Sequence, residues 1–226
     1  MTPFSRKVAS MLRVLLRRYP VRNWARGRHP FDVLVSIVLS QATTDVNADR
    51  AMRQLRKLTR VTPKDLALFP VRKLARAIRV AGLSKQKAPR IQALAKEVIR
   101  RYGGDLLRLR NLDTKEARRE LRSLTGIGPK TADVWLNLVL NREVVPLDTH
   151  IWRVSRRWGF RTKDYDRLSE KLAHLLPGRR RQQGHLAIIA FGREYCQARR
   201  PRCLSCPLAD GCPSRKRFVN AGRAKV

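Results

Sequence analysis

The sequence predicts an all-α protein of about ten short helices, an estimate from the 3.6-residue period of its apolar side chains. That period recurs along nearly the whole chain, and no segment shows the alternation expected of a half-buried strand. Proline and glycine stand beside several of the apolar stripes, as they do at helix ends. The 226 residues suit one large domain or two small ones, and composition marks no clear linker.

The N-terminal part of the chain supplies three apolar stripes and one helix-start signal. The first two stripes consist of Val8, Met11, Leu12, Leu15 and Leu16, and of Phe31, Leu34, Val35, Val38 and Leu39. The third consists of Ala48, Ala51, Met52 and Leu55. Thr62 and Pro63 followed by Asp65 predict a helix start, because the carboxylate would lie near the positive end of the helix dipole.

Two later stripes end at helix-breaking residues. One stops at the glycines 103 and 104 and consists of Ile91, Leu94, Ala95, Val98, Ile99 and Tyr102. The other stops at Pro177 and Gly178 and consists of Leu168, Leu172, Leu175 and Leu176. Three tryptophans fall at helical spacings, which predicts core positions rather than platforms for stacked bases: Trp135, Trp152 and Trp158.

The charge of the chain points to a polyanionic partner. Lys and Arg number 51 against 17 Asp and Glu, which gives a formal net charge of +34, and no acidic residue precedes Asp32. Such an excess repels itself unless a polyanion neutralises it. Nucleic acid is therefore the first expectation and an anionic membrane the second, with a merely solvated basic surface as the remaining interpretation.

The apolar runs are too short for a membrane span. The longest, at residues 33–39 and 186–191, fall far short of the ~20 residues that a bilayer requires. Arg13 interrupts the N-terminal apolar run, which therefore lacks the core of a secretory signal, and a basic transit peptide stays open. We expect a cytoplasmic, nucleoid-associated protein that has no membrane partner and acts as a monomer.

The segment LTGIGPKTADVWLN, residues 124–137, has the pattern of a helix–hairpin–helix. Gly126 and Gly128 form a tight turn, and Pro129 fixes φ at the start of a second helix. Glycines let a ligand approach the backbone, and free N–H groups at a helix start bind phosphate without sequence preference. An ordinary turn capped by glycine is the alternative, and the charge of the chain favours phosphate binding.

Lys130 stands at the start of that second helix. The positive end of the helix dipole and the net charge of the chain both disfavour a protonated amine there. An uncharged amine is the form that a nucleophilic, Schiff-base lysine requires. A charged lysine that contacts phosphate is the alternative.

A carboxylate, Asp148, follows in the segment VPLDTHIWRV, residues 145–154. It could stabilise positive charge that develops on a sugar, or it could relay protons. It also stands where the N-cap of a helix is expected, directly before Thr149. One aspartate can fill both roles.

All four cysteines lie near the C-terminus, in the order Cys196-x6-Cys203-x2-Cys206-x5-Cys212. Zinc sites usually pair their cysteines as two short knuckles, and only the middle two form one here. Disulfides would require an oxidising compartment, which nothing else in the sequence indicates. One compact loop with four thiolates suits a 4Fe-4S cluster better.

Three arginines stand between the first two cysteines: Arg199, Arg200 and Arg202. A cluster-bound loop would hold their guanidinium groups outward in a fixed array, which favours phosphate binding. The alternative is that they are only solvated.

Together these motifs resemble the endonuclease III branch of the DNA glycosylases. The likeness rests on the hairpin of the form L-x-G-(I/V)-G-x-K-T-A, the D-T-H after it, and a cysteine spacing that matches the family's cluster loop. Residues 30–45, PFDVLVSIVLSQATTD, resemble the family's early helix and lesion-side loop. Residues 81–91, AGLSKQKAPRI, resemble its second DNA-facing loop, so the likeness covers nearly the whole chain.

The resemblance implies a two-lobed helical fold and a bifunctional DNA glycosylase/AP lyase. One lobe would span residues 24–134, and the other would join residues 1–23 to residues 135–226 and hold the 4Fe-4S cluster. The partner would be double-stranded DNA with a damaged base, an oxidised pyrimidine, or with an abasic site.

The resemblance also implies roles for individual residues. Lys130 would attack C1′ of the sugar and displace the base, Asp148 would assist, and β-elimination would then nick the strand. A second group of residues would contact DNA: Gly126, Gly128, Thr131, Gln41, Ala42, Leu83, His150 and the three arginines. For His150, a structural role is the alternative.

The early loop departs from the family's pattern. It reads LSQATTD, whereas the family's glutamine stands one place later, as in S-A-Q-(A/T)-T-D. With Asp45 aligned, Ala42 falls where that glutamine would fill the gap left by the flipped base, and Gln41 is one residue away. Leu83 matches the apolar wedge of the other loop, with a buried core leucine as the alternative. The lesion and the preferred opposite base therefore stay open.

Three other functions stay open as well. A monofunctional glycosylase for mismatched or deaminated bases shares the fold but generally has another residue in place of Lys130. An AP lyase with weak base excision would result if the altered loop fails to hold a base. A non-catalytic DNA-binding iron–sulfur protein would need neither Lys130 nor Asp148.

Overall fold

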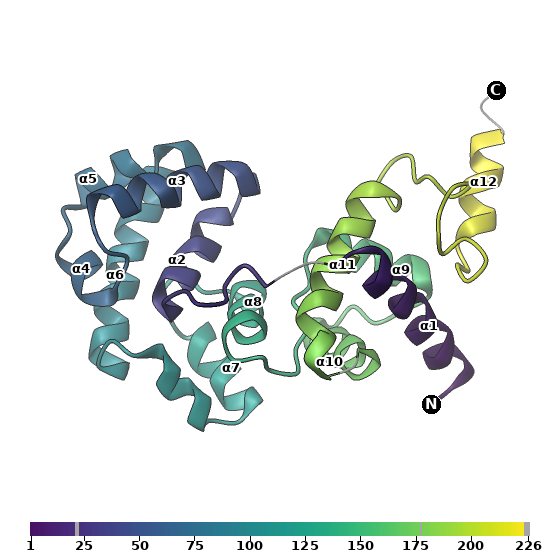
Figure 1. Cartoon of the computed structure of the whole chain (residues 1–226), viewed down its shortest axis with the longest axis horizontal. Coiled ribbons are helices and arrows are strands. Elements are labelled where there is room, and N and C mark those ends of the chain that lie inside the picture. The colour runs from purple at the N-terminus through teal and green to yellow at the C-terminus, as the bar shows by residue number, and fades with distance from the viewer. Residues whose placement is uncertain (21–22, 177, 224–226) are drawn as a thin grey trace. The chain divides into compact units, whose positions relative to one another are not determined.

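The computed structural model describes residues 1–20, 23–176 and 178–223, and every regular element in these ranges is helical. They contain twelve α-helices and three short 3-10 helices (Figure 1), which confirms the all-α prediction. The chain divides into two compact units. One is Ala25–Arg142, and the other joins Met1–Trp24 to Glu143–Val226.

The unit Ala25–Arg142 is built around α6, its longest helix. The helices are α2 (Pro30–Ser40), α3 (Asp45–Leu58), α4 (Pro63–Leu68), α5 (Val71–Ala77), α6 (Ser84–Tyr102), α7 (Thr114–Arg122) and α8 (Pro129–Val139), with 3-10 turns η1 (Arg79–Ala81) and η2 (Leu106–Asn111). Helices α4 and α5 pack against α6, while α2 packs against α3 and α8 (Figure 1). Trp135 of α8 is fully buried, and its indole N–H donates to the Pro30 carbonyl at 2.9 Å.

Side-chain caps explain where several of these helices begin and end. The Thr62 hydroxyl accepts from the backbone N–H of Asp65 at 3.2 Å, as the start signal predicts. Helix α7 begins with a capping box formed by Asp113 and Glu116. Helix α6 ends at Gly103, whose φ of 63° lies in the left-handed region that favours glycine.

The boundary between the units differs from the expected one at residues 134–135. That position lies inside α8, whose residues 131–138 are all buried, and the units change only after Arg142. The Arg142 guanidinium donates to the carbonyls of Arg110 and Leu112, both at 2.7 Å, and so holds the end of the first unit. A side-chain-to-backbone contact of this kind leaves no pattern in composition.

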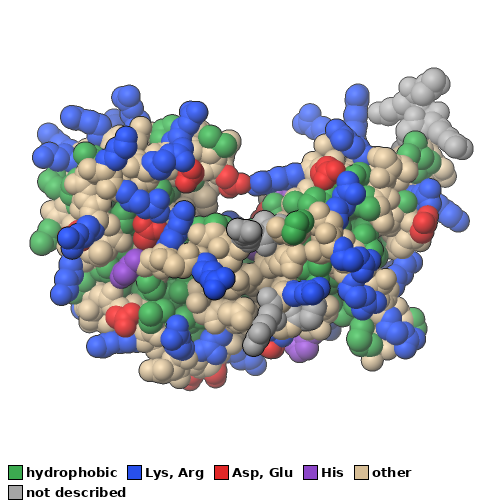
Figure 2. All heavy atoms as spheres, in the orientation of Figure 1, with side chains coloured by type: hydrophobic (Ala, Val, Ile, Leu, Met, Phe, Trp, Pro, Cys, Tyr) green, Lys and Arg blue, Asp and Glu red, His purple; other side chains and the backbone are tan. Residues whose placement is uncertain are grey.

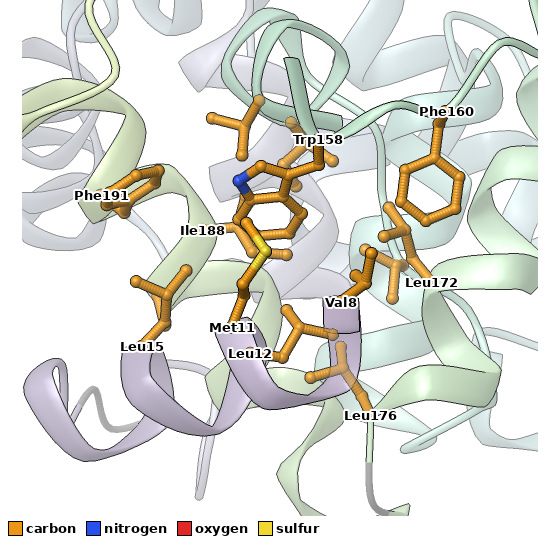
Figure 3. Packing of buried hydrophobic residues seen from close by; sticks show 14 of the residues in the cluster. Val8, Met11, Leu12, Leu15, Trp158, Phe160, Leu172, Leu176, Ile188 and Phe191 are labelled. Carbon is orange, nitrogen blue, oxygen red and sulfur yellow. The ribbon is translucent and has the colours of Figure 1, made fainter. Parts of the chain in front are cut away.

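The other unit combines α1 (Pro3–Arg18) with the C-terminal helices of the chain. These are α9 (Thr149–Trp158), α10 (Tyr165–Leu175), η3 (Gly178–Arg180), α11 (Arg181–Glu194) and α12 (Arg215–Arg223). Figure 3 shows the shared core, in which Leu12 and Leu15 of α1 lie in one buried cluster with Trp158 and Phe191. The stop predicted at Pro177 lies outside the described residues.

Positive charge is spread over the surface of both units. Figure 2 shows Lys and Arg side chains across the visible face, with only scattered Asp and Glu. In the described ranges, we find no helix with the length and apolar content that a bilayer crossing requires.

Candidate active site

The hairpin turn, residues 123–128, joins α7 to α8 and leaves the start of α8 uncapped. No side chain in the described ranges caps this helix, and Pro129 occupies its first turn. Gly126 has a φ of 77°, which favours glycine. Gly128 has an ordinary φ of −87°, and a Cβ there would meet nothing within 4 Å. The first N–H groups of α8 can therefore bind a phosphate that approaches Gly128.

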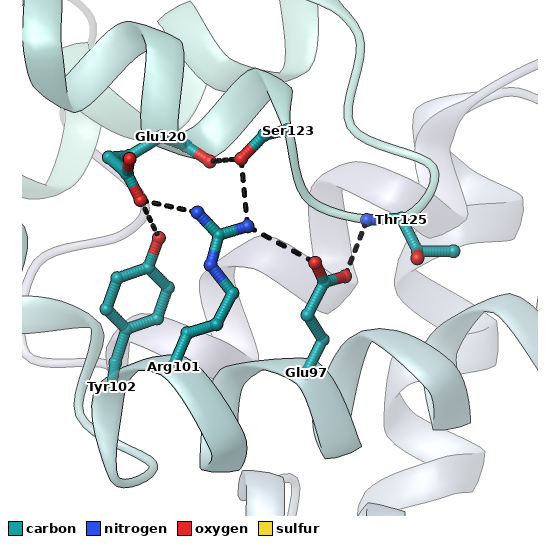
Figure 4. Close-up of polar contacts among 6 residues, drawn as sticks. All are labelled: Glu97, Arg101, Tyr102, Glu120, Ser123 and Thr125. Atoms are coloured by element: carbon teal, nitrogen blue, oxygen red, sulfur yellow. Dashed lines mark hydrogen bonds and ion pairs between the residues drawn. The ribbon is translucent and has the colours of Figure 1, made fainter.

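A polar network on α6 holds this turn (Figure 4). The carboxylate of Glu97 accepts from the backbone N–H of Thr125 at 2.9 Å and from Arg101 at 3.2 Å. Arg101 also donates to the Ser123 hydroxyl at 2.8 Å and to Glu120. Burial raises the pKa of Glu97, but the hydrogen bonds from Thr125 and Arg101 outweigh burial, so the pKa lies below its ordinary value.

A buried ion pair joins the two helices of the hairpin. The Arg118 guanidinium of α7 donates to both carboxylate oxygens of Asp133 of α8, at 2.8 and 3.1 Å. Both side chains are buried, as is Ile127 in the turn between them. Because removal of one partner would leave the other charge buried, this pair fixes α7 against α8.

Lys130 is exposed on the first turn of α8, and the next residue turns inward. Thr131 is buried, and its hydroxyl accepts a hydrogen bond from the Gln41 side-chain amide at 3.0 Å. The early loop is therefore tied to the helix that carries Lys130. A direct contact of Thr131 or Gln41 with DNA stays a prediction.

The two predicted DNA-facing loops each contain a non-glycine residue in the left-handed region. Ala42 follows α2 with a φ of 53°, and Leu83 precedes α6 with a φ of 50°. Such residues are uncommon and occur where the surroundings hold them. Leu83 is 53% exposed, which excludes the alternative of a core leucine.

Sequence reasoning missed Lys87, which lies between these loops. The side chain is 3% exposed, and its ammonium donates to backbone carbonyls of both loops. Burial lowers the pKa of Lys87. A signal was present, because Lys87, Ile91 and Leu94 fall at helical spacing on the buried face of α6.

Asp148 belongs to the other unit and caps α9, as predicted. Its Oδ1 accepts from the backbone N–H of Ile151 at 2.8 Å. His150 lies one turn before Arg153, and its Nδ1 is 2.9 Å from the Arg153 guanidinium. Burial lowers the pKa of His150, and Arg153 lowers it further while Asp148 opposes the shift. These contacts favour the structural interpretation of His150.

The four cysteines carry free, partly buried thiols and line one pocket together with Phe191 and Leu208. No three Cys, His, Asp or Glu side chains in the described ranges are arranged to hold a metal ion. Burial, reinforced by the neighbouring thiols, raises the pKa of Cys206 to about 11. Four thiols that line one largely apolar pocket match an iron–sulfur cluster in the type and number of its ligands. The fit therefore rests on the donor set and not on the spacing of the thiols.

Helix α9 anchors this cysteine loop through two arginines. The Arg153 guanidinium donates to the Cys196 carbonyl at 2.8 Å. Arg157 donates to the Cys196 sulfur at 3.2 Å and to the carbonyls of Gln197 and Ala198 at 2.7 and 2.9 Å. The helix capped by Asp148 is thus bonded directly to the start of the loop.

Comparison with known proteins decides the family. The profile of the HhH-GPD superfamily base excision DNA repair protein matches residues 35–178, more than half of the chain. Endonuclease III of Bacillus subtilis (strain 168) is 35% identical over 200 residues, which cover 87% of each chain. The chain belongs to the endonuclease III family.

Solved structures of the family share the fold over nearly the full length. A non-covalent endonuclease III–DNA complex matches with a TM-score of 0.80 at 30% identity, covering 97% of this chain and 99% of that chain. A trapped endonuclease III–DNA covalent intermediate matches with a TM-score of 0.79 at the same identity and coverage.

In this endonuclease III family member, the predicted site residues fall into three groups. Lys130, the hairpin glycines, Gln41 and Leu83 belong to the unit Ala25–Arg142, where hydrogen bonds link the early loop to α8. Asp148 and His150 begin α9 of the other unit, and the four cysteines share one pocket there. The three loop arginines, Arg199, Arg200 and Arg202, are all exposed.

Proposed function

We propose that this chain is a bifunctional DNA glycosylase/AP lyase that excises oxidised pyrimidines from duplex DNA. The observation that carries the proposal is Lys130, an exposed amine on the first turn of an uncapped helix. Membership of the family supports the proposal. The solved structures of endonuclease III that match this chain include a non-covalent complex with DNA and a trapped covalent intermediate with DNA.

The hairpin would hold the DNA backbone beside this amine. Phosphate would bind the free N–H groups of α8, where Gly128 leaves room for it. This contact carries no sequence preference, as a repair enzyme requires. The neighbouring Lys130 would then face the sugar of a flipped-out nucleotide, whose extrusion costs least at an already weakened pair.

The first chemical step would replace the base by the enzyme. Lys130 Nζ forms a bond to C1′ as the C1′–N bond breaks, and the base leaves with the bonding electrons and takes up a proton. Asp148 would stabilise the positive charge on the sugar and accept a proton from the amine. The C1′–O4′ bond of the sugar ring then breaks, and O4′ takes up a proton from solvent. The ring-opened product is an iminium, which only an amine nucleophile can form.

The second step would cut the strand. The iminium acidifies C2′, a proton leaves C2′, and the C3′–O bond breaks with the phosphate as the leaving group. Water then hydrolyses the imine and frees the Lys130 amine. A serine or tyrosine in this position could support base removal only.

The two loops would act on the base pair itself. Leu83 has an exposed side chain on a left-handed backbone, and this side chain would enter the duplex as an apolar wedge. Gln41 would have to leave Thr131 to fill the gap, because Ala42 carries no group that can do so. The preferred opposite base would therefore depend on how readily Gln41 is released.

We further propose that Cys196, Cys203, Cys206 and Cys212 hold a 4Fe-4S cluster. All four ligand positions would be filled by the protein, so the group would organise the loop rather than activate substrate. The three exposed arginines of this loop would then contact phosphate. A genomic DNA substrate would place the protein at the nucleoid in the cytoplasm.

Reduction of the imine by borohydride tests the proposal. The protein would be incubated with duplexes that carry thymine glycol, uracil, a G·T mismatch or an abasic site, with borohydride present. We expect a covalent adduct on the thymine glycol and abasic duplexes that is lost in Lys130→Ala and retained in Lys96→Ala, an exposed lysine elsewhere in the unit.

Each alternative function gives a different result. Base release without any adduct would identify a monofunctional glycosylase. An adduct confined to the abasic duplex would identify an AP lyase with weak excision. No adduct and no base release on any duplex would indicate a non-catalytic DNA-binding protein and contradict the proposal.

A further inference from the structure

The ammonium of Lys87 makes three hydrogen bonds, all to backbone carbonyls. The acceptors are Leu39 at 2.9 Å, Gln41 at 2.7 Å and Ala81 at 2.9 Å. A lysine ammonium has three N–H groups, so every donor of Lys87 is used within the protein. Although Lys87 lies in a basic segment of a predicted DNA-facing loop, it has no donor left for a phosphate.

These acceptors explain why a buried cation is tolerated. Leu39 is in the last turn of α2, where carbonyls lack helical partners and the helix dipole is negative. Helix α2 has no basic residue in its own last turn, so Lys87 supplies that charge from α6. The Gln41 carbonyl belongs to the residue that ends α2, and Ala81 ends η1.

The same bonds connect the two loops that the proposed function assigns to the base pair. Leu39 and Gln41 both lie just before Ala42 in the chain, and Ala81 lies two residues before Leu83. Ala42 and Leu83 both hold a left-handed backbone, a conformation that persists only where the surroundings fix it. One side chain therefore secures both strained segments, and Gln41 carries the link on to Thr131 of α8.

We propose that Lys87 is a positioning residue that sets the distance between the Gln41 loop and the Leu83 loop, so that both act together when a base is extruded. The inference rests on the proposed glycosylase function. If it holds, loss of Lys87 slows extrusion of a paired base more than any later step. The penalty shrinks when the pair is already weak, because extrusion then costs less.

Lys87→Met, which removes all three donors, tests this with Lys85→Met as the matched control. Lys85 is exposed in the same first turn of α6 and is free to contact phosphate. Single-turnover excision would be measured for one lesion in a stable pair and for the same lesion in a mismatched, weakened pair. For Lys87→Met we expect about a tenfold loss on the stable pair and less than about threefold on the weakened pair.

Two physical readouts separate positioning from other roles. A 2-aminopurine placed opposite the lesion should show a smaller fluorescence rise in Lys87→Met, because fewer bases are extruded. The salt dependence of DNA binding should be unchanged in Lys87→Met but shallower in Lys85→Met, by about one phosphate contact. A shallower salt dependence in Lys87→Met would overturn the inference, since it would make Lys87 a phosphate ligand.

The single-turnover excision rates on the stable and weakened pairs also test the inference. Equal losses on stable and weakened pairs, or no loss on either, would overturn it. If Lys87→Met does not fold, Lys87→Gln keeps two donors, and we expect at least about a threefold greater loss on the stable pair. A folded Lys87→Gln with equal rates on both pairs would overturn the inference.

Adduct formation by the wild-type protein distinguishes a failure of this inference from a failure of the proposed function. A wild type that forms no reduced adduct on an abasic duplex contradicts the glycosylase/lyase function itself. A wild type that forms the adduct, beside a Lys87→Met variant whose two excision rates fall equally, contradicts only the role of Lys87.

Discussion

The carboxylate of Glu97 on α6 accepts a hydrogen bond of 2.9 Å from the backbone N–H of Thr125 in the hairpin turn. Near the other end of the same helix, Lys87 bonds the carbonyls of the two loops. Helix α6 therefore contacts the hairpin through its C-terminal half and both loops through its first turn. The DNA-facing segments proposed for this unit share one rigid support.

Stability should fall in acid as the support of the hairpin is protonated. The pKa of Glu97 lies below its ordinary value of 4.5, so its stabilisation is present above pH 4.5 and is lost as the pH falls through the lower, folded-state pKa. Glu120 acts in the same direction, because the hydrogen bond from Tyr102 lowers its pKa. Urea unfolding of wild type and Glu97→Gln between pH 3 and pH 7 measures the effect.

Glu97→Gln should be less stable than wild type at pH 7 and should lose less on acidification, since an amide can still accept from Thr125 but does not titrate. Glu170→Gln, an exposed position, serves as the control for a lost charge. Parallel pH curves for wild type and Glu97→Gln would show that the carboxylate does not stabilise the fold.

The two hairpin glycines should respond differently to alanine. Gly126→Ala places a side chain at a φ of 77° and should lower the free energy of unfolding by about 1 kcal/mol. Gly128→Ala meets no atom within 4 Å and should change stability by less than about 0.5 kcal/mol. Because its new methyl group would lie where a phosphate approaches, affinity for an abasic duplex should fall about tenfold.

The Gly128→Ala prediction is checked by chemical denaturation and by fluorescence anisotropy on labelled duplex. Unchanged affinity would mean that the DNA backbone does not approach this turn.

Asp148 is the N-cap of α9 and also carries the charge proposed to assist catalysis. Two substitutions separate the capping role from the catalytic role. Asn is as good an N-cap as Asp, so Asp148→Asn should keep the Ile151 bond and stability within about 0.5 kcal/mol, whereas Asp148→Ala should lose about 1 kcal/mol. Both should slow base excision by at least about a hundredfold. Single-turnover rates and melting curves give the result, and an active Asp148→Asn would leave Asp148 with the capping role alone.

Arg157 should govern how firmly the cysteine loop retains its proposed cluster. It donates to the Cys196 sulfur and to two loop carbonyls, and its guanidinium stacks 4.4 Å from the centre of the Phe218 ring. Arg157→Met should therefore lose iron to a chelator several-fold faster than wild type. Iron content and visible absorption follow the loss, with the exposed Arg156→Met as control. Equal retention in both variants would exclude this role.

Local sequence patterns predicted much of the fold, because each such pattern involves only residues that are near one another in the sequence. The stripe of α6, the Thr62 cap and the Gly-Ile-Gly turn each depend on residues that lie close together in the sequence, and each is present. The N-cap role of Asp148 was predictable for the same reason.

Contacts between distant segments could not be predicted in this way. Gln41 and Thr131 are 90 residues apart, and nothing in either segment indicates that the amide binds the hydroxyl. Lys87 stands in a segment that resembles a DNA-facing loop, and only its place on the apolar face of α6 reveals that it is buried. Arg142 ends the first unit, and its bonds to the carbonyls of two residues about thirty positions earlier leave no trace in composition.

The identity of the residue that forms the Schiff base tests the central claim most directly. The borohydride-reduced adduct with an abasic duplex would be digested with nuclease and trypsin, and the modified peptide sequenced by mass spectrometry. We predict that the sugar remnant lies on Lys130, within an uncleaved peptide spanning residues 123–142, because a modified lysine resists trypsin. A remnant on any other lysine, or on the N-terminal amine, would contradict the account.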